Sequence, residues 1–358
     1  MSLTILNVGF SLATVSQSTP GGAEQILRCI DEALVEAGHR SIVVAPAGSS
    51  CRGALLATRA VESQLDEEKH TVACEEQRRA IQRALSEFPI DLIHMHGIDF
   101  HRYLPTTEIP VLVTLHLPLS WYPREIFLAG PHPFLLVCVS RSQARSCPAG
   151  TRIEAVIENG VDVPQTCLGL KKENYVAALG RICPEKGFHL ALDAANNAGL
   201  PLVLAGNVFG YAAHQQYWKQ EIEPRLKPPH RFLGAVGPRK KRDLLAHACC
   251  LVVSSLVEET SCLVAMEAMA CGTPVVALRR GALAEIVHEG RTGILVNSRE
   301  QLADAILAAR RLSPMTCWEH ARTHFSASRM TTRYVHLYRH LIQQRVSTVL
   351  QRGAEWVA

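Results

Sequence analysis

The most constraining feature of this sequence is a regular alternation of short apolar runs with longer stretches of helical periodicity. In the first half of the chain, helical stretches such as 23–37 and 75–86 separate the apolar runs. The apolar runs that we predict as strands are 4–8, 41–45, 91–94, 111–115, 135–139 and 155–157. This order predicts a parallel sheet that is covered by helices on both faces.

The alternation stops at Val163–Lys172, where proline, glycine and charged residues occur without a clear period. We predict that this segment is an interdomain linker. Beyond it the alternation restarts, with strands at 175–179, 201–205, 231–233, 251–254, 274–278 and 293–296 and helices at 188–198, 215–225, 241–248, 261–270, 300–311 and 328–349. A chain of 358 residues can form two domains. We therefore expect two doubly wound α/β domains, with a ligand in the crevice beyond the carboxyl ends of their strands.

The composition narrows the class of protein. Hydrophobic residues make up 47% and the net charge is +4, which is typical of a soluble globular protein and excludes a nucleic-acid-binding tail. No apolar stretch reaches transmembrane length, and the first residues resemble a strand rather than a signal peptide. The twelve cysteines include no Cys-x-x-Cys pair, so we expect mostly reduced core cysteines in a cytoplasmic protein.

Two glycine-containing loops could bind phosphate. Gly21 and Gly22 precede an amphipathic helix, whose first N–H groups can face an anion, although an ordinary loop-to-helix turn has the same composition. Arg181 and Lys186 follow the predicted strand 175–179 in a loop bounded by glycines. Because the loop lies at the carboxyl end of a strand, we predict that these two cations bind a diphosphate. The alternative is a basic turn exposed to solvent.

The strongest signal is the predicted helix 261–270, which is apolar all round and carries one carboxylate, Glu267. A buried carboxylate needs a partner, and the vicinal diol of a sugar can donate two hydrogen bonds to it. The alternative partner is a lysine or arginine in a buried salt bridge. The basic run 239–242 is either the solvated start of a helix or a group that faces a phosphate-bearing ligand.

The residues before this helix are also candidates. Glu259 lies at a predicted strand end and can point into the same crevice. We predict Thr260 or Ser261 as the N-cap, so that the N–H groups of Cys262 and Leu263 face an anion.

Histidines gather at two strand ends of the first half. His116 follows the predicted strand 111–115 and could be either a structural residue or part of the site. His94, His96 and His101 raise the alternative of a metal site. We predict no metal site there, because His-x-His would place its rings on opposite faces of a strand and no carboxylate triad is near.

Together these motifs resemble glycosyltransferase family 4, the retaining glycosyltransferases with the GT-B fold, over nearly the whole chain. The segments that carry the resemblance are Gly21–Glu24, Asp91–Gly97, Glu158–Asp162, Gly180–Gly187 and, most specifically, Glu259–Ala277 with its two glutamates eight positions apart. Many members of that family have Gly-Phe-Gly where this chain has Thr260-Ser261-Cys262, which leaves the identity of the sugar open.

The resemblance implies a role for each of these positions. It implies that Arg181 and Lys186 hold the donor diphosphate, that Glu259 binds the donor sugar and that Glu267 binds the ribose. It also implies that His116 lines the reaction centre. Backbone contacts to the donor are implied for Gly21, Gly22, Val236, Ser261, Cys262, Leu263 and Val264.

The family's fold and activity follow as expectations. The expected fold is GT-B, two Rossmann-like domains facing across a cleft, with an acceptor domain at 1–163, a donor domain at 164–325 and a helix at 326–358 that crosses back. The expected activity, in EC class 2.4, is transfer of a hexose or related sugar, with retention, from a nucleotide-diphosphate sugar, UDP being the expected nucleotide, without a cofactor. Because no Asp-x-Asp occurs, basic side chains are expected to replace a metal ion.

Three alternatives concern the acceptor and the reaction itself. The acceptor could be a small molecule, a glycan or a lipid-linked glycan, and the last would fit peripheral membrane association. A nucleotide-sugar epimerase of the same architecture would bind the same donor and need no acceptor. An inactive nucleotide-sugar-binding protein would keep the cleft without turnover.

Overall fold

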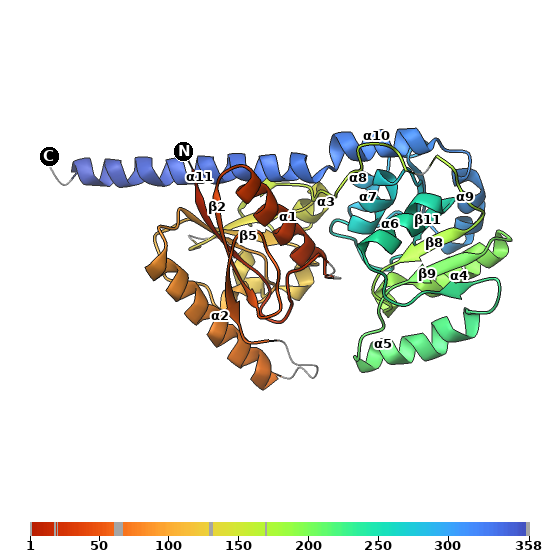
Figure 1. The fold of residues 1–358 in the computed structure, drawn as a ribbon, viewed down its shortest axis with the longest axis horizontal. Helices are drawn as coiled ribbons and strands as arrows, with labels where there is room; N and C mark the ends of the chain where they lie inside the picture. The colour runs from red at the N-terminus through yellow and green to blue at the C-terminus, as the bar shows by residue number, and fades with distance from the viewer. Residues whose placement is uncertain are drawn as a thin grey trace. The chain divides into compact units, whose positions relative to one another are not determined.

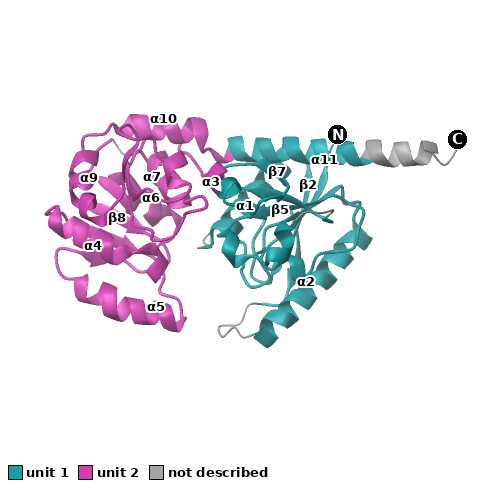
Figure 2. Cartoon of the chain, turned by 180° about the vertical axis from the view of Figure 1, so that it is seen from behind, with its two compact units in different colours: residues 1–139, 143–158, 328–358 teal, residues 140–142, 159–327 magenta. Residues whose placement is uncertain are grey.

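The computed structural model describes residues 2–355 apart from 18, 20, 61–66, 129–131 and 169, and it describes side chains as far as residue 345. The chain forms two compact units (Figure 2). Unit 1 comprises residues 1–139, 143–158 and 328–358, and unit 2 comprises residues 140–142 and 159–327. The chain therefore passes into unit 2 after Glu158 and returns to unit 1 at Ser328.

Unit 1 is built on a seven-stranded sheet in which every pair of neighbouring strands is parallel (Figure 1). The strand order is β3-β2-β1-β4-β5-β6-β7. The strands are β1 (Thr4–Val8), β2 (Arg40–Pro46), β3 (Ala54–Thr58), β4 (Leu92–Met95), β5 (Val111–Leu115), β6 (Leu135–Cys138) and β7 (Ile153–Val156). Central strands such as β4 and β5 are buried along their whole length, in agreement with their mostly apolar sequences.

The α-helices of unit 1 are α1 (Gly22–Glu36), α2 (Glu67–Glu87), α3 (Arg141–Arg145), whose first residues are assigned to unit 2, and most of α11 (Ala327–Glu355). Helix α11 is anchored by two buried tyrosines, Tyr334 and Tyr338. The Tyr338 hydroxyl lies 2.7 Å from Nδ1 of His94 in β4, and the Tyr334 hydroxyl lies 3.0 Å from Oγ1 of Thr114 in β5. The last helix of the chain is thus part of the core of unit 1.

Unit 2 repeats the architecture with six parallel strands in the order β10-β9-β8-β11-β12-β13. Its strands are β8 (Val176–Leu179), β9 (Leu202–Ala205), β10 (Arg231–Phe232), β11 (Cys250–Val253), β12 (Val275–Leu278) and β13 (Gly293–Val296). Its α-helices are α4 (Phe188–Asn197), α5 (Ala212–Tyr217), α6 (Pro238–His247), α7 (Leu263–Ala270), α8 (Leu283–Ile286), α9 (Leu302–Ala309) and α10 (Pro314–His324). The prediction of two Rossmann-like parallel α/β halves is confirmed.

Both sheets reverse their winding direction at one place. In unit 1 the reversal lies between β1 and β4, and in unit 2 it lies between β8 and β11, strands that are neighbours in space but not in sequence. The connections leave these two strands in opposite directions, which opens a crevice at their carboxyl ends. The loops after β8 and β11 are therefore the first place to look for a ligand site in unit 2.

Several elements were not predicted from the sequence, among them the short helices α3 and α8, strand β3 and helix α10. Strand β3 was not predicted, because it is an edge strand whose residues are only half-buried or exposed and so lack a clear alternation. Helix α10 was also not predicted, although Ser313 caps it by accepting a hydrogen bond from the Thr316 N–H and proline occupies its first turn.

The segment predicted as a linker, Val163–Lys172, lies within unit 2, although its Gly169 is outside the described residues. The Pro164 carbonyl accepts a hydrogen bond from Nε1 of Trp318 in α10. The amine of Lys172 lies 2.9 Å from the Ala246 carbonyl and 2.5 Å from Oγ1 of Thr273. Burial lowers the pKa of Lys172 to about 8. These contacts tie the segment to the core of unit 2.

Most of the cysteines are buried, as predicted. In the part of the chain that the structure describes, no helix is both long enough and apolar enough to cross a membrane.

Candidate functional site

The loop after β8 is held against the carboxyl edge of the unit 2 sheet by backbone contacts. The Ile182 N–H donates to the Asn207 carbonyl at 2.9 Å, and the Leu256 N–H, after β11, donates to the Glu185 carbonyl at 2.8 Å. Gly187 ends the loop with a φ of 60°, and a Cβ there would collide with the carbonyl oxygen of Ser254. The loop therefore needs glycine at this position both for its left-handed backbone and for close packing on β11.

Lys186, from this loop, forms an ion pair with Glu259, from the loop after β11. Its Nζ lies 2.6 Å from Oε1 of Glu259, and the Ser255 hydroxyl donates to the same oxygen. The side chain of Glu259 is 9% exposed and that of Lys186 is 27% exposed. Burial is the largest single influence on Lys186 and would lower its pKa, but the charge of Glu259, the neighbouring Cys262 and the hydrogen bond to Glu259 together outweigh burial. The pKa of Lys186 is therefore raised and the amine stays cationic.

The backbone around Glu259 is fixed from the far side by a turn after β12. The Ala282 N–H donates to the Glu259 carbonyl at 2.7 Å. Gly281 has a φ of 53°, and a Cβ there would meet the backbone of Glu259. Glu259 is consequently held in place by three segments, which is the rigidity that a specific ligand contact requires.

The start of α7 differs from the prediction. The N-cap is Cys262, in a left-handed conformation with a φ of 57°, and not Thr260 or Ser261. Ser261 instead accepts a hydrogen bond from Nδ2 of Asn159 at 2.9 Å. The helix begins at Leu263, so the amides of Leu263 and Val264 belong to its first turn and can face an anion. Burial, followed by the charge of Glu259, raises the pKa of Cys262 to about 12.

Glu267, on α7, forms a salt bridge. Its Oε1 lies 2.5 Å from Nζ of Lys241 on α6, and the two side chains are 18% and 25% exposed. From the sequence, either a sugar diol or a basic side chain could be the partner of this carboxylate. In the structure its partner is a basic side chain, Lys241. Lys241 belongs to the basic run 239–242. This residue of the run therefore contacts α7.

Two further predicted residues of unit 2 lie on loops at the same edge of the sheet. Arg181 is exposed in the loop that carries Lys186. Val236 lies between β10 and α6, is half-buried, and packs against the core that contains α7. The structure therefore brings together Lys186, Glu259 and the start of α7, and it places Arg181 and Val236 on loops at the same edge.

The other predicted site residues, Gly21, Gly22 and His116, lie in unit 1. His116, after β5, is buried, and its Nε2 lies 3.1 Å from Nδ1 of His96, with the two rings stacked. Burial lowers the pKa of His116 to about 3, and it lowers the pKa of His94 and of His96 well below the ordinary value. These imidazoles are accordingly neutral at physiological pH.

The argument that His-x-His would separate its two rings was wrong. The ring centroids of His94 and His96 lie 3.9 Å apart. Residues two apart along an extended segment share one face, so His94, His96 and His116 form a continuous row of rings.

Gly21 and Gly22 form the start of α1, with Gly21 as the N-cap. The Glu24 side chain occupies the space beside Gly21, because a Cβ at Gly21 would collide with its carboxylate. A carboxylate thus takes the place where an anion would meet this helix, and the role of the two glycines in donor binding stays a prediction.

Sequence reasoning missed Ser255, Lys241 and His96 as members of these arrangements. Ser255 could have been found, since it directly follows a predicted strand at the switch point. The pairing of Lys241 with Glu267 and of His96 with His116 joins residues that are far apart in the sequence, and no spacing rule indicates it.

Two family models match this chain. Residues 20–165 match the model described as Glycosyltransferase Family 4, and residues 173–311 match the model described as Glycosyl transferases group 1. The two matches correspond to the main segments of unit 1 and unit 2.

Curated proteins with related sequences are glycosyltransferases by name. The chain is 35% identical over 140 residues to a D-inositol 3-phosphate glycosyltransferase of Mycobacterium marinum, which covers 38% of this chain and 30% of the relative. It is 26% identical over 212 residues to a lipopolysaccharide 1,2-N-acetylglucosaminetransferase of Salmonella typhimurium, with coverages of 56% and 52%. The match thus spans between about a third and about a half of the length of these relatives.

Solved structures share the fold along nearly the whole chain. A sucrose-phosphate synthase from Thermosynechococcus elongatus superposes with a TM-score of 0.75 at 19% identity, covering 96% of this chain and 100% of that one. AviGT4, a glycosyltransferase of avilamycin A biosynthesis, gives 0.70 at 22% identity, with coverages of 95% and 98%. The Anabaena protein HepE, in complex with UDP and glucose, gives 0.70 at 22% identity, with coverages of 94% and 99%. The fold of the two units is therefore GT-B, as predicted.

Proposed function

Because this chain belongs to glycosyltransferase family 4, we propose that it transfers a sugar from a nucleotide-diphosphate sugar to an acceptor hydroxyl. The observation that carries the proposal is the cluster of Lys186, Glu259 and Ser255 beside the first turn of α7. It lies at the switch point of the unit 2 sheet, where a doubly wound fold binds its ligand.

The cationic part of this cluster suits the donor diphosphate. Lys186 is held cationic by Glu259, and Arg181 lies on the same loop. The amides of Leu263 and Val264 add the positive end of a helix. We expect these groups to stabilise the charge that develops on the departing diphosphate, the largest single contribution in reactions of this kind.

The acidic part suits the hydroxyl groups of the donor. Glu259 uses Oε1 for Lys186 and Ser255, which leaves Oε2 for the sugar. Glu267 can take the ribose diol if Lys241 shares or releases it. A uridine nucleotide is the proposed donor, in line with the complex of the structurally similar HepE with UDP-glucose.

The proposed reaction retains the anomeric configuration. A donor phosphate oxygen accepts the proton of the acceptor hydroxyl while that hydroxyl attacks from the face that the diphosphate leaves. The absence of Asp-x-Asp from the sequence and the presence of Lys186 and Arg181 support stabilisation of the leaving group by side chains in place of a metal ion. The acceptor, a small molecule, a glycan or a lipid-linked glycan, stays a prediction, as do the cytoplasmic location and the peripheral membrane association.

A panel of nucleotide sugars tests the proposal. A donor that binds the folded protein raises its unfolding temperature by mass action, so UDP-, GDP- and ADP-sugars can be ranked by thermal shift. The best donor is then incubated with candidate acceptors, and the products are identified by mass spectrometry and NMR, which also report the anomeric configuration. Formation of an epimer without any acceptor would replace the transferase proposal with the epimerase, and donor binding without any product would favour the inactive binding protein.

A further inference from the structure

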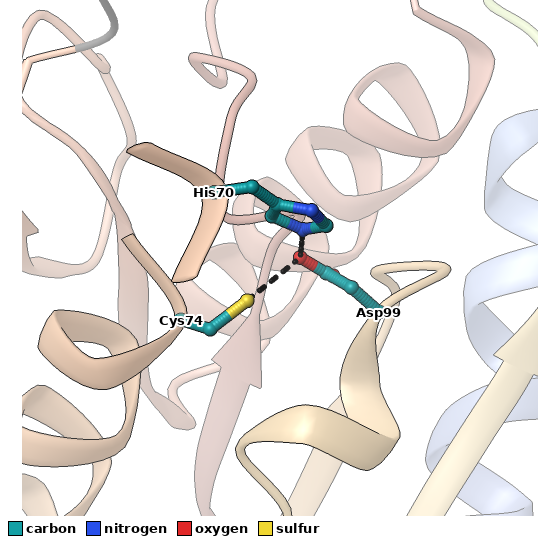
Figure 3. A group of neighbouring side chains, drawn as sticks. All are labelled: His70, Cys74 and Asp99. Carbon is teal, nitrogen blue, oxygen red and sulfur yellow. Dashed lines mark hydrogen bonds and ion pairs between the residues drawn. The ribbon is translucent and has the colours of Figure 1, made fainter. Parts of the chain in front are cut away.

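A second cluster of side chains lies at the switch point of unit 1, apart from the residues assigned to the transfer. Figure 3 shows His70 and Cys74, both on α2, pointing at the carboxylate of Asp99 in the loop after β4. We propose that His70, Cys74 and Asp99 bind a divalent transition-metal ion, Zn²⁺, in unit 1.

The spacing on α2 supports the proposal. His70 and Cys74 are four residues apart, so they lie on one face of the helix, one turn apart. An imidazole, a thiolate and a carboxylate are the ligands that Zn²⁺ prefers in proteins. Cys74 and Asp99 are buried, whereas the His70 side chain is 22% exposed, which gives an ion a route into the cluster.

The distances between the three ligand atoms fit a metal ion. Nε2 of His70 lies 3.0 Å from Oδ2 of Asp99, Sγ of Cys74 lies 3.6 Å from that oxygen, and all three atoms lie within 4.8 Å of one another. A tetrahedral ion with bonds of about 2.0–2.3 Å separates neighbouring ligand atoms by roughly 3.3–3.6 Å. The two distances to Asp99 thus lie within a few tenths of an ångström of that spacing, and the ligand atoms of His70 and Cys74 lie no more than 4.8 Å apart.

The surroundings orient the carboxylate in advance. The Tyr103 hydroxyl donates to Oδ1 of Asp99 at 2.7 Å, and the Ser11 hydroxyl donates to Oδ2 at 2.5 Å. Hydrogen bonds of this kind fix the orientation of a metal ligand and raise the affinity of its site. Oδ2 is the oxygen that both His70 and Cys74 face.

Binding requires one exchange of partners at His70. In this structure Nη1 of Arg102 lies 3.0 Å from Nδ1 of His70, which must then accept a hydrogen bond. An imidazole that binds a metal through Nε2 carries its proton on Nδ1 and needs an acceptor there. Oε2 of Glu67 lies 4.0 Å from Nδ1, so Glu67 can replace Arg102 and complete a carboxylate–histidine–metal arrangement.

The charges of the ligands also balance. Metal binding removes the thiol proton of Cys74, and the resulting thiolate and the Asp99 carboxylate together neutralise a dication. The complex that is buried therefore carries no net charge. The ion would join α2 to the loop after β4, and its effect is expected on the stability of unit 1.

The test uses the full-length protein after removal of metal with a chelator. Titration with Co²⁺ should give the thiolate-to-cobalt charge-transfer absorption with one ion per chain, and Zn²⁺ should abolish it by competition. Cys74→Ser should lose this absorption and bind Zn²⁺ at least about 100-fold more weakly, a larger loss than that for removing an outer-shell partner. Cys51→Ser is the matched control, because Cys51 is a partly buried thiol of the same unit whose Sγ contacts the Gly53 carbonyl.

Two further variants keep the test decisive if Cys74→Ser does not fold. His70→Asn alters a partly exposed side chain and should also lose tight Zn²⁺ binding, while Glu67→Gln should keep one site per chain with an affinity about 10–100-fold lower. Absence of the charge-transfer absorption in the folded wild-type protein, or equal Zn²⁺ affinity in the wild type and His70→Asn, would overturn the proposal. Neither readout depends on glycosyl transfer.

Discussion

Lys186 and Glu259 form an ion pair that bears on stability and that we propose for the chemistry. The pair is partly buried and leaves Glu259 one oxygen for a ligand. Its contribution to stability is present below the ordinary pKa of a lysine and is lost as the pH rises through the raised pKa of Lys186. At physiological pH the pair is therefore fully formed.

Lys186→Ala is expected to lower kcat by about 10²–10³-fold, as for loss of one donor to a transition-state oxyanion. Turnover with the donor found in the nucleotide-sugar panel measures the effect, and circular dichroism checks that the variant is folded. Lys219→Ala removes an exposed lysine of the same unit and should leave kcat unchanged. Near-normal turnover in Lys186→Ala would remove Lys186 from the proposed mechanism.

Glu267 and Lys241 can be separated by a pair of variants. If Glu267 binds the ribose, Glu267→Gln should weaken nucleotide binding about 10-fold or more, the loss of one to two charge-assisted hydrogen bonds. Lys241→Ala should affect nucleotide binding less, because it leaves the carboxylate in place. Isothermal titration calorimetry measures both affinities. If both variants lost the same amount of stability and bound the nucleotide as tightly as the wild type, the pair would have a purely structural role.

The row of buried histidines predicts how stability depends on pH. The pKa values of His94, His96 and His116 are lowered by burial, so the unfolded chain binds protons at these residues that the folded chain does not. Their contribution is present above the unfolded pKa of about 6.5 and is lost as the pH falls below it, by up to roughly 1.4 kcal/mol per pH unit for each histidine.

Denaturant unfolding between pH 7.5 and pH 5 measures this dependence. The variant His96→Phe, which cannot take up a proton, should show a shallower decrease in unfolding free energy than the wild type. His247, which is exposed on α6, provides the control, since His247→Phe should leave the slope unchanged. A wild-type slope no steeper than that of His96→Phe would contradict the prediction.

At the scale of elements, glycines set how closely the loops of unit 2 approach one another. Gly187 and Gly199 both have left-handed backbone, with φ values of 60° and 67°. An added Cβ at Gly187 would collide with the backbone of Ser254, directly after β11, whereas at Gly199 it would meet nothing within 4 Å. The two positions therefore differ in the space around them and not in conformation.

Gly199→Ala should cost about 1–2 kcal/mol, the penalty for left-handed backbone alone. Gly187→Ala carries the same penalty and must also push the Lys186 loop away from β11, so we expect a larger loss of stability together with weaker donor binding. Denaturant unfolding and calorimetric titration of both variants measure these effects. Equal behaviour of the two variants would show that the contact with β11 does not position the loop.

At the scale of the whole molecule, the two units have separate cores, but unit 1 is assembled from three segments of the chain and unit 2 from two. Helix α11 completes unit 1, where Tyr338 bonds to His94, although unit 2 separates these residues in the sequence. Unit 1 can therefore finish folding only after the last helix of the chain has been made.

Calorimetry of the full chain should accordingly resolve two unfolding transitions. Most of the groups that we propose for nucleotide binding lie in unit 2, so saturating nucleotide should stabilise that unit more, by about 2.7 kcal/mol at 100 times the Kd. Tyr338→Phe removes the hydroxyl partner of His94 and should lower only the transition of unit 1. A nucleotide that stabilised the two units equally would contradict the proposal that unit 2 holds most of the donor contacts.

The sequence by itself determined the α/β class, the two parallel sheets and the family, because these depend on periodic patterns and on motifs such as Glu259–Ala277 that are local in the chain. It also predicted Lys186 and Glu259 as site residues, since each follows a strand, and the structure places these two strands at the switch point. Only the tertiary structure decided that these two bind each other, that Lys241 neutralises Glu267 and that Cys262 caps α7. It also brought His70 and Cys74 to Asp99. Such contacts join residues from different strands and helices, and their identity depends on packing in three dimensions, which no local pattern encodes.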